Sequence, residues 1–191
     1  MPDWRDSVVI VSGLPRSGTS MMMGMLEAGG VPVLCDGARA ADADNPRGYF
    51  EYQPVKRLKE DNTWLPEARG KAVKIVSLLL EHLPPALPCK VVFLERDLPE
   101  ILASQRRMLL RNGEAPGEDE AALRAIYRKH LEHVRGWLAR RAGVETLYVR
   151  YQDAIAVPGE VANTVNRFCG NGLDVDAMAR AVDAALYRQR R

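Results

Sequence analysis

A glycine-bounded segment near the start of the chain, residues 13–20 (GLPRSGTS), combines residue types that bind anions. Glycines at its two ends let the backbone curl so that successive N–H groups point inward, and a helix that begins there adds its partial positive charge. The residues expected to contact the anion are Arg16, Ser17, Gly18, Thr19 and Ser20. The segment therefore predicts a cradle for a phosphate group.

One position separates this loop from the GxxxxGK[ST] loop of ATP- and GTP-hydrolysing proteins. Thr19 stands where that pattern has the lysine that reaches the β- and γ-phosphates. Transfer of a γ-phosphoryl group needs that lysine and Mg²⁺ to neutralise the terminal phosphate, whereas a sulfuryl group carries less negative charge on its oxygens. The loop favours sulfuryl transfer. A kinase or NTPase with a degenerate loop is the alternative, with Asp97 as its metal ligand, although Arg96 beside it would repel the metal.

Two motifs resemble those of the sulfotransferases that use 3′-phosphoadenosine 5′-phosphosulfate (PAPS). Residues 15–20 (PRSGTS) are similar to the family's 5′-phosphosulfate motif, P-[RK]-S-G-T-[ST], and Arg96 with Ser104 eight residues later is similar to its 3′-phosphate motif. The ending, residues 182–191, resembles the close of bacterial members, with Ala184 where proline is expected. The resemblance implies a small bacterial-type sulfotransferase with PAPS as sulfuryl donor and no metal.

The position of Arg96 agrees with this resemblance. It follows the apolar run 90–95, and ligands of open α/β sheets bind at the carboxyl ends of strands, where Arg96 would meet the same nucleotide as the 13–20 loop. Charge-assisted contacts contribute about 1.5 to 3 kcal/mol each, so Arg96 and Ser104 would select a 3′-phosphorylated nucleotide over ATP. Further along the same predicted helix, Arg106, Arg107 and Arg111 extend the positive charge.

Sulfuryl transfer to a hydroxyl or amine also needs cations at the bridging oxygen and a base for the acceptor proton. Lys74, near the end of the run 71–76, resembles a lysine that some members hold over the leaving group, and Arg16 is the loop's own cation. Other members use a carboxylate after the first helix, which leaves Asp36 and Glu51 as candidate bases here. No histidine lies where the small-molecule branch of the family places its catalytic one; the three are His82, His130 and His133.

The elements that position these residues follow a strand–helix alternation typical of a doubly wound sheet. Continuous apolar runs predict parallel strands at 8–13, 71–76, 90–95 and 144–149. Helices are expected at 18–29, 54–62, 97–112, 119–142, 158–169 and 174–180. Apolar residues spaced by three and four predict that the helix 119–142 faces the core along Leu123, Ile126, Tyr127, Leu131, Val134, Trp137 and Leu138. We predict a P-loop-type three-layer α/β/α fold with a mostly parallel central sheet of about four to five strands.

The least regular stretch, residues 33–65, mixes glycine, proline and charges of both signs. Its part 44–52 (DNPRGYFEY), which contains Glu51, resembles a segment common in bacterial sulfotransferases. An insertion beside a binding loop is often a lid or substrate platform, and a plain solvated loop is the alternative. We expect the acceptor to bind on this side.

Composition bounds the remaining possibilities. The 191 residues are 47% hydrophobic, enough for one domain over 1–191 with a real core. A formal net charge of +2 gives no global field for binding nucleic acid or an anionic membrane, and no apolar run is long enough to span one. The three cysteines lack any CxxC spacing, which favours a reduced, cytoplasmic protein without a zinc site. The acceptor is left open as a small molecule, carbohydrate or peptide, and a module that binds the nucleotide without turnover is the third reading.

Overall fold

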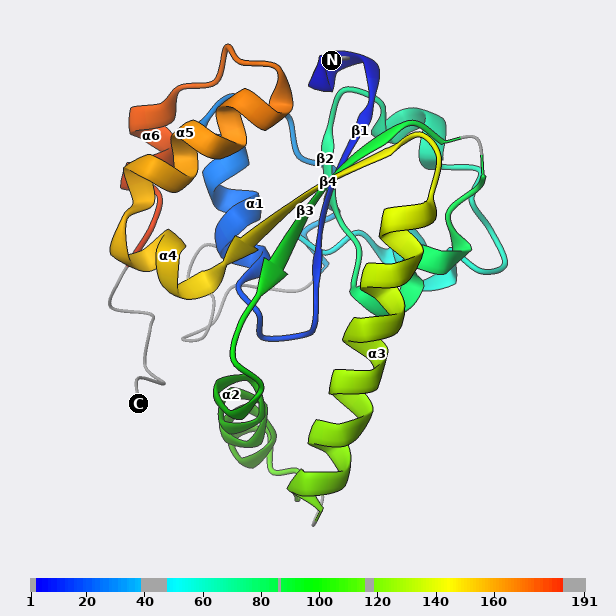
Figure 1. The fold of residues 1–191 in the computed structure, drawn as a ribbon, viewed down its shortest axis with the longest axis vertical. Helices are drawn as coiled ribbons and strands as arrows, with labels where there is room; N and C mark the ends of the chain where they lie inside the picture. The colour runs from blue at the N-terminus through cyan, green and yellow to red at the C-terminus, as the bar shows by residue number, and fades with distance from the viewer. Residues whose placement is uncertain (1–2, 39–47, 86, 116–118, 184–191) are drawn as a thin grey trace.

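The computed structural model describes residues 3–38, 48–85, 87–115 and 119–183, and its centre is a parallel sheet in the order β2-β1-β3-β4 (Figure 1). The strands are β1 (Val8–Gly13), β2 (Ala72–Lys74), β3 (Cys89–Glu95) and β4 (Val144–Arg150). Every pairing between them is parallel, and Val33 adds an isolated parallel bridge to Ala72 on the outer side of β2. The predicted α/β fold with a parallel sheet is confirmed.

Helices cover both faces of the sheet and so make three layers (Figure 1). One face carries α1 (Thr19–Ala28), α4 (Tyr151–Ala156), α5 (Pro158–Cys169) and α6 (Val175–Arg180). The other face carries α3 (Glu120–Arg140) and the 3-10 helices η2 (Gln53–Arg57), η3 (Leu65–Ala68) and η4 (Ser77–His82). α2 (Leu98–Arg111) follows β3 and lies beyond the carboxyl ends of the strands, as Figure 1 shows.

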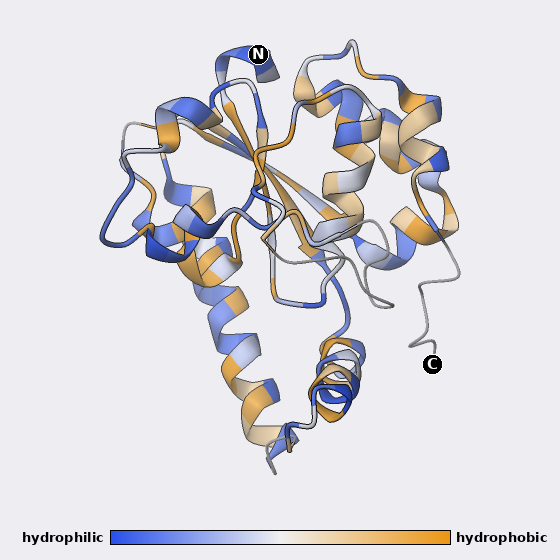
Figure 2. Ribbon diagram, turned by 180° about the vertical axis from the view of Figure 1, so that it is seen from behind, coloured by the Kyte–Doolittle hydropathy of each residue, from blue (hydrophilic) through white to orange (hydrophobic). Residues whose placement is uncertain are grey.

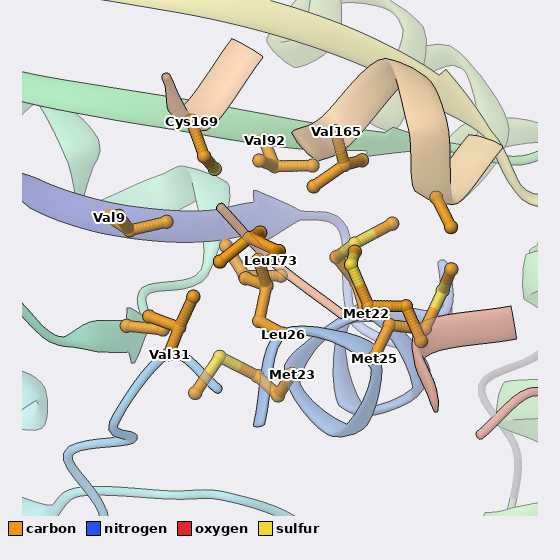
Figure 3. Packing of buried hydrophobic residues seen from close by; sticks show 14 of the residues in the cluster. Val9, Met22, Met23, Met25, Leu26, Val31, Val92, Val165, Cys169 and Leu173 are labelled. Carbon is orange, nitrogen blue, oxygen red and sulfur yellow. The ribbon is translucent and has the colours of Figure 1, made fainter. Parts of the chain in front are cut away.

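Burial on both faces of the sheet explains why the strands are continuous apolar runs in the sequence. Every residue of β1 is buried, because Val9 and Val11 face the α1 side while Val8 and Ile10 face the α3 side. On the α1 side, methionines of α1 form one cluster with Val9 and Val92 of the sheet and Val165 and Cys169 of α5 (Figure 3). The strands are the most hydrophobic part of the ribbon, and the outer helices mix both kinds of residue (Figure 2).

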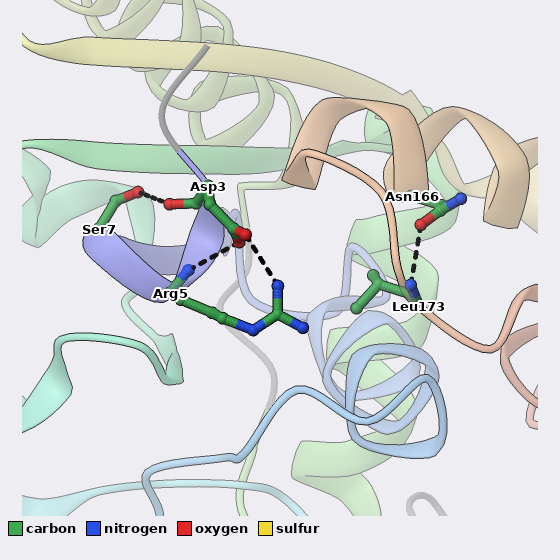
Figure 4. A network of polar contacts seen from close by, with 5 residues as sticks. All are labelled: Asp3, Arg5, Ser7, Asn166 and Leu173. Atoms are coloured by element: carbon green, nitrogen blue, oxygen red, sulfur yellow. Dashed lines mark hydrogen bonds and ion pairs between the residues drawn. The ribbon is translucent and has the colours of Figure 1, made fainter.

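Local polar contacts fix two segments at the amino end of the sheet (Figure 4). Asp3 caps the short 3-10 helix η1 (Trp4–Asp6) by accepting the Arg5 backbone N–H at 3.1 Å. The Asn166 side chain accepts the Leu173 backbone N–H at 3.0 Å and so fixes the turn between α5 and α6. These contacts hold η1 and the α5–α6 turn at the amino end of the sheet, away from the 13–20 loop.

The strand order places a crevice where the sequence put its motifs. From β1, the chain crosses to β2 on one side, and β3 then pairs on the other side of β1. Ligands of open α/β sheets bind at such a reversal, outside the carboxyl ends of the strands. The 13–20 loop leaves β1 and Arg96 follows β3, so both lie at this crevice.

Two predicted helices differ from the structure. The helix expected at 54–62 is the 3-10 helix Gln53–Arg57 followed by turns, because Val55 and Leu58 are the buried residues and their spacing of three suits 3-10 geometry. The predicted core-facing stripe of α3 is wrong over its first half, where Ile126 is 61% exposed, and only Val134 and Leu138 are buried. α3 extends past the strand ends there, so no core lies beneath it (Figure 1).

Two smaller differences concern the length of β2 and a short helix that the sequence did not predict. β2 covers only residues 72–74 of the predicted run 71–76, although the Ile75 N–H still donates to the Val11 carbonyl at 3.0 Å. α4 was not expected, since its six residues end at Ala156, two residues before Pro158, and carry too few turns for a periodic signal. Among the residues described, no helix has both the length and the apolar character needed to cross a membrane.

Candidate active site

The 13–20 loop is built on two glycines that no other residue could replace without strain. Gly13 has a φ of 148°, and a Cβ there would lie 2.5 Å from Ser17 Oγ and 2.7 Å from the Leu94 carbonyl. Gly18 has a φ of 101°, and a Cβ there would lie 2.4 Å from the Tyr151 ring. Gly18 also caps α1 without a side-chain hydrogen bond, so the helix opens directly from the loop. The tight packing leaves the loop backbone one conformation.

Ser17 and Arg16 show what this loop can hold. Ser17 is 1% exposed, and its hydroxyl has no hydrogen-bond partner among the residues that the structure describes. A buried unpaired hydroxyl is costly, and it fits an anion that would accept from it. Arg16 has a φ of 71°, in the left-handed region that non-glycine residues rarely adopt. The loop therefore has the geometry that the anion-binding prediction requires.

Arg16 is the point where the two sequence motifs meet. Its Nε donates to Ser104 Oγ at 3.0 Å, across 88 residues of sequence. Its carbonyl accepts from Arg96 Nη1 at 3.1 Å. The second motif thus contacts Arg16 at two points, its side chain through Ser104 and its strained backbone through Arg96. The structure brings together Arg16, Ser104 and Arg96 as the sequence predicted.

Arg96 is fixed by further contacts that the sequence analysis did not anticipate. Its Nε lies 2.9 Å from Glu100 Oε2, and the two side chains are only 7% and 6% exposed. The Tyr151 ring covers its guanidinium with 4.3 Å between Cζ and the ring centroid. Burial raises the pKa of Tyr151, so the ring stays neutral at physiological pH. Glu100 was detectable from its i, i+4 spacing to Arg96, and Tyr151 from its place directly after a strand.

The segment 48–52 lies against the other side of the loop. The Tyr49 carbonyl accepts from Ser20 Oγ at 3.4 Å, and Lys74 Nζ also contacts that carbonyl. Phe50 has a φ of 51° and packs near Gly24 of α1. Lys74, at the end of β2, is therefore beside the loop as predicted, and Tyr49 links it to the start of α1. No local sequence signal marks Tyr49 for this role.

The two candidate bases are neighbours in the structure, because the Asp36 backbone N–H donates to the Glu51 carbonyl at 3.1 Å. Their carboxylates differ in what they contact. The Asp36 carboxylate accepts the N–H of Gln53 at 2.5 Å and that of Ala38 at 3.0 Å, and these bonds hold its pKa below the usual value. The Glu51 side chain is 22% exposed and lies 3.7 Å from Lys56 Nζ.

The remaining charged candidates lie further from the loop. His130 Nε2 lies 2.9 Å from the buried Ser77 hydroxyl, and His133 pairs with Glu81 at 2.9 Å, so both fasten α3 to η4. His82 ends η4, and Arg106, Arg107 and Arg111 are exposed on α2. Arg188, Arg190, Arg191 and the first part of the 44–52 segment lie outside the described residues. Within those residues, no three His, Cys, Asp or Glu side chains are grouped to hold a metal ion.

A cavity of about 200 Å³ adjoins the site between α2 and α3. Its lining includes Leu14 of the loop, Arg96, Ile101, Leu131 and Gln152. The cavity is smaller than the 300 to 1,000 Å³ typical of a complete small-molecule site, so it extends the crevice and does not form a separate pocket.

Three solved structures with a similar fold are sulfotransferases. The structure is similar to the sulfotransferase domain from the curacin biosynthetic pathway (TM-score 0.56, 13% identity), covering 95% of this chain and 89% of that one. It is similar to sulfotransferase STF1 from Mycobacterium tuberculosis H37Rv (TM-score 0.60, 16% identity), covering 95% and 73%. It is also similar to mouse sulfotransferase SULT7A1 complexed with PAP (TM-score 0.53, 16% identity), covering 97% of this chain but 65% of the mouse chain.

These identities show a shared fold, and the family is shown by the sequence itself. No curated protein matches the chain. The family model described as the sulfotransferase domain matches residues 6–190, which include the 13–20 loop, Arg96 and Ser104. The match decides against the kinase alternative, and the chain belongs to the sulfotransferase domain family.

Proposed function

We propose that this sulfotransferase takes its sulfuryl group from PAPS and passes it to a hydroxyl or amine of a small molecule, carbohydrate or peptide. One observation carries the proposal: Arg16 of the 13–20 loop is hydrogen-bonded both to Ser104 and to Arg96. A loop suited to a 5′-phosphosulfate and an Arg–Ser pair suited to a 3′-phosphate are thus parts of one site. The mouse relative solved with PAP supports the same class of nucleotide.

In this proposal each end of the nucleotide has its own residues. The loop residues Ser17, Gly18, Thr19 and Ser20 bind the 5′ end through backbone N–H groups and hydroxyls, and Arg96 with Ser104 binds the 3′-phosphate. Bound PAPS supplies an activated sulfuryl group on a phosphate leaving group. Arg16 and Lys74 stabilise the negative charge that develops on the leaving oxygen, because Arg16 belongs to the loop and Lys74 contacts the same Tyr49 carbonyl as Ser20 of the loop. The site needs no metal in this scheme.

The acceptor would approach over the segment 48–52, part of the predicted 33–65 insertion. We propose Glu51 as the base that takes the acceptor proton, because it is two residues from the carbonyl that Lys74 and Ser20 contact. Asp36 serves better as an anchor, since its carboxylate already accepts two backbone N–H groups. A carboxylate so engaged is a weak base with little freedom to reach a substrate.

We further propose that residues 1–191 form a single domain and that the protein works in a reducing compartment such as the cytoplasm. Cys35, Cys89 and Cys169 are all unpaired, and burial raises the pKa of Cys89 to about 11 and that of Cys169 to about 12. Such thiols remain protonated and unreactive at physiological pH.

The direct test is an acceptor screen with PAPS, in which release of 3′,5′-adenosine diphosphate is measured. Phenols, alcohols, amines, sugars and tyrosine peptides are offered one class at a time, with chelator present. We expect nucleotide release that depends on one acceptor class and is lost in Ser104→Ala. Release that needs Mg²⁺, or transfer from ATP in place of PAPS, would contradict the proposal.

A further inference from the structure

We propose that Glu100 is a positioning residue for nucleotide recognition: its buried carboxylate fixes the orientation of Arg96 and thereby sets the preference for a 3′-phosphorylated nucleotide. This inference rests on the proposed function, because it takes Arg96 as the reader of the 3′-phosphate. Glu100 itself would not touch the nucleotide. Its role is exerted through the guanidinium that it holds.

The carboxylate of Glu100 is engaged on both oxygens. Oε2 accepts from Arg96 Nε at 2.9 Å, and Oε1 accepts from Gln152 Nε2 at 3.5 Å. Both members of the ion pair are more than nine-tenths buried. Gln152 belongs to α4, which follows the neighbouring strand β4, so a second helix also fixes the carboxylate. An exposed i, i+4 pair would fluctuate, but this one is held by packing.

Arg96 is held from three directions. Glu100 takes Nε, the Arg16 carbonyl takes Nη1 at 3.1 Å, and the Tyr151 ring covers the face of the guanidinium. A long arginine side chain normally loses rotamer freedom when it binds a phosphate, and fixing it beforehand lowers that cost. Glu100 is the one charged member of this set, so it contributes the strongest of the three contacts.

Two opposite consequences of the Glu100 charge must be weighed. A carboxylate near a phosphate repels it, which would weaken binding. Without the carboxylate, however, the buried guanidinium of Arg96 loses the charge-assisted contact at Nε, and breaking a buried ion pair is costly enough to let the side chain change its orientation. That movement would also break the bond to the Arg16 carbonyl. We therefore expect the positioning effect to exceed the repulsion.

The test compares two nucleotides that differ only in the 3′-phosphate, 3′,5′-adenosine diphosphate and 5′-AMP, by isothermal titration. Glu100→Gln should lower the ratio of the two affinities, the preference for the first nucleotide over the second, about tenfold, as expected for one misplaced charge-assisted contact. Glu100→Asp keeps the charge at a shorter reach and should fall between. The Arg96 Nε–H signal, followed by NMR, should be protected from exchange in the wild type and lose that protection in Glu100→Gln.

Glu145→Gln is the matched control. Glu145 pairs at 3.1 Å with Lys90, a 1% exposed cation at the opposite end of β3, so the variant also removes the partner of a buried charge. It should lower the melting temperature and leave the ratio of the two affinities at the wild-type value. A stability effect alone is thereby separated from positioning.

Three results would overturn the inference. An unchanged ratio in Glu100→Gln means that Glu100 has only a structural role, and tighter binding of 3′,5′-adenosine diphosphate means that repulsion is the larger effect. The third result is that the wild-type protein binds the two nucleotides with equal affinity. This result differs from the other two, because it refutes the proposed function itself and leaves Glu100 no preference to set.

Discussion

Arg16 combines a strained backbone, a cationic side chain and contacts to both motifs, so its replacement tests several steps at once. Arg16→Ala should abolish turnover and weaken binding at the 5′ end of the nucleotide, since residues 13–20 contain no other cation. Arg16→Lys keeps the charge but loses the Nε bond to Ser104, and it should keep part of the binding. Titration with 3′,5′-adenosine diphosphate measures nucleotide binding by both variants. Full binding by Arg16→Ala would refute this role.

The base can be identified from a pair of isosteric variants. Glu51→Gln should lower turnover by roughly 10² to 10⁴-fold and keep nucleotide binding, as expected for loss of a general base. Asp36→Asn should destabilise the fold instead, because an amide has a single oxygen for the two N–H groups of Ala38 and Gln53. Initial rates and thermal melts separate these effects.

The opposite pattern, with Asp36→Asn inactive but stable, would exchange the two assignments.

Asp36 also adds an acid dependence to stability. Its pKa is lower in the folded state, so its contribution is present above the unfolded pKa of about 3.9 and is lost as the pH falls through the folded value.

At the scale of elements, the buried residues of α3, Val134 and Leu138, both lie in its second half. Leu138→Ala should cost about 2 to 5 kcal/mol because it opens a cavity against the sheet, whereas Ile126→Ala should cost less than about 0.5 kcal/mol. The residues are 3% and 61% exposed. Urea denaturation gives both values. Equal costs would mean that the first half of α3 is buried in solution.

The contact between α3 and η4 predicts a pH effect on stability. Burial lowers the pKa of His130 below its usual value of 6.5, with Glu81 opposing the shift. The unfolded chain therefore binds the proton more readily, so stability is fully present above the unfolded pKa and falls as the pH drops through the folded pKa. The free energy of unfolding should decrease from pH 7.5 to 5.5.

His130→Gln should reduce that decrease, because it removes the imidazole whose pKa burial lowers. If His130→Gln kept the full pH dependence, the titrating group would be another one.

Elements with a strong local signal were predictable from the sequence. β1 with its glycine loop and α1, and β3 with Arg96 and α2, agree with the structure because apolar runs and glycines determine them locally. The η2 helix and the exposed half of α3 were missed, since a periodic pattern does not reveal whether a core lies beneath it. The contact of Lys74 with the Tyr49 carbonyl spans 25 residues of irregular chain, and only tertiary packing determines it.

For the molecule as a whole, the strand order makes one site from distant segments. The crevice between β1 and β3 gathers Arg16, Arg96 and Ser104, and the segment before η2 returns to place Tyr49 beside Lys74. Cations thus lie on both sides of the loop while the net charge of the chain is only +2. Anion binding here depends on local arrangement and not on overall charge.

The proposed function requires this crevice to bind a 3′-phosphorylated adenine nucleotide without a metal. The most direct measurement is the thermal unfolding of the protein with 3′,5′-adenosine diphosphate in chelator, compared with ADP and Mg²⁺. At a concentration 100 times its dissociation constant, the first should stabilise the fold by about 2.7 kcal/mol, and the second should stabilise it much less. Equal stabilisation by the two nucleotides, or stabilisation only with Mg²⁺, would contradict the account.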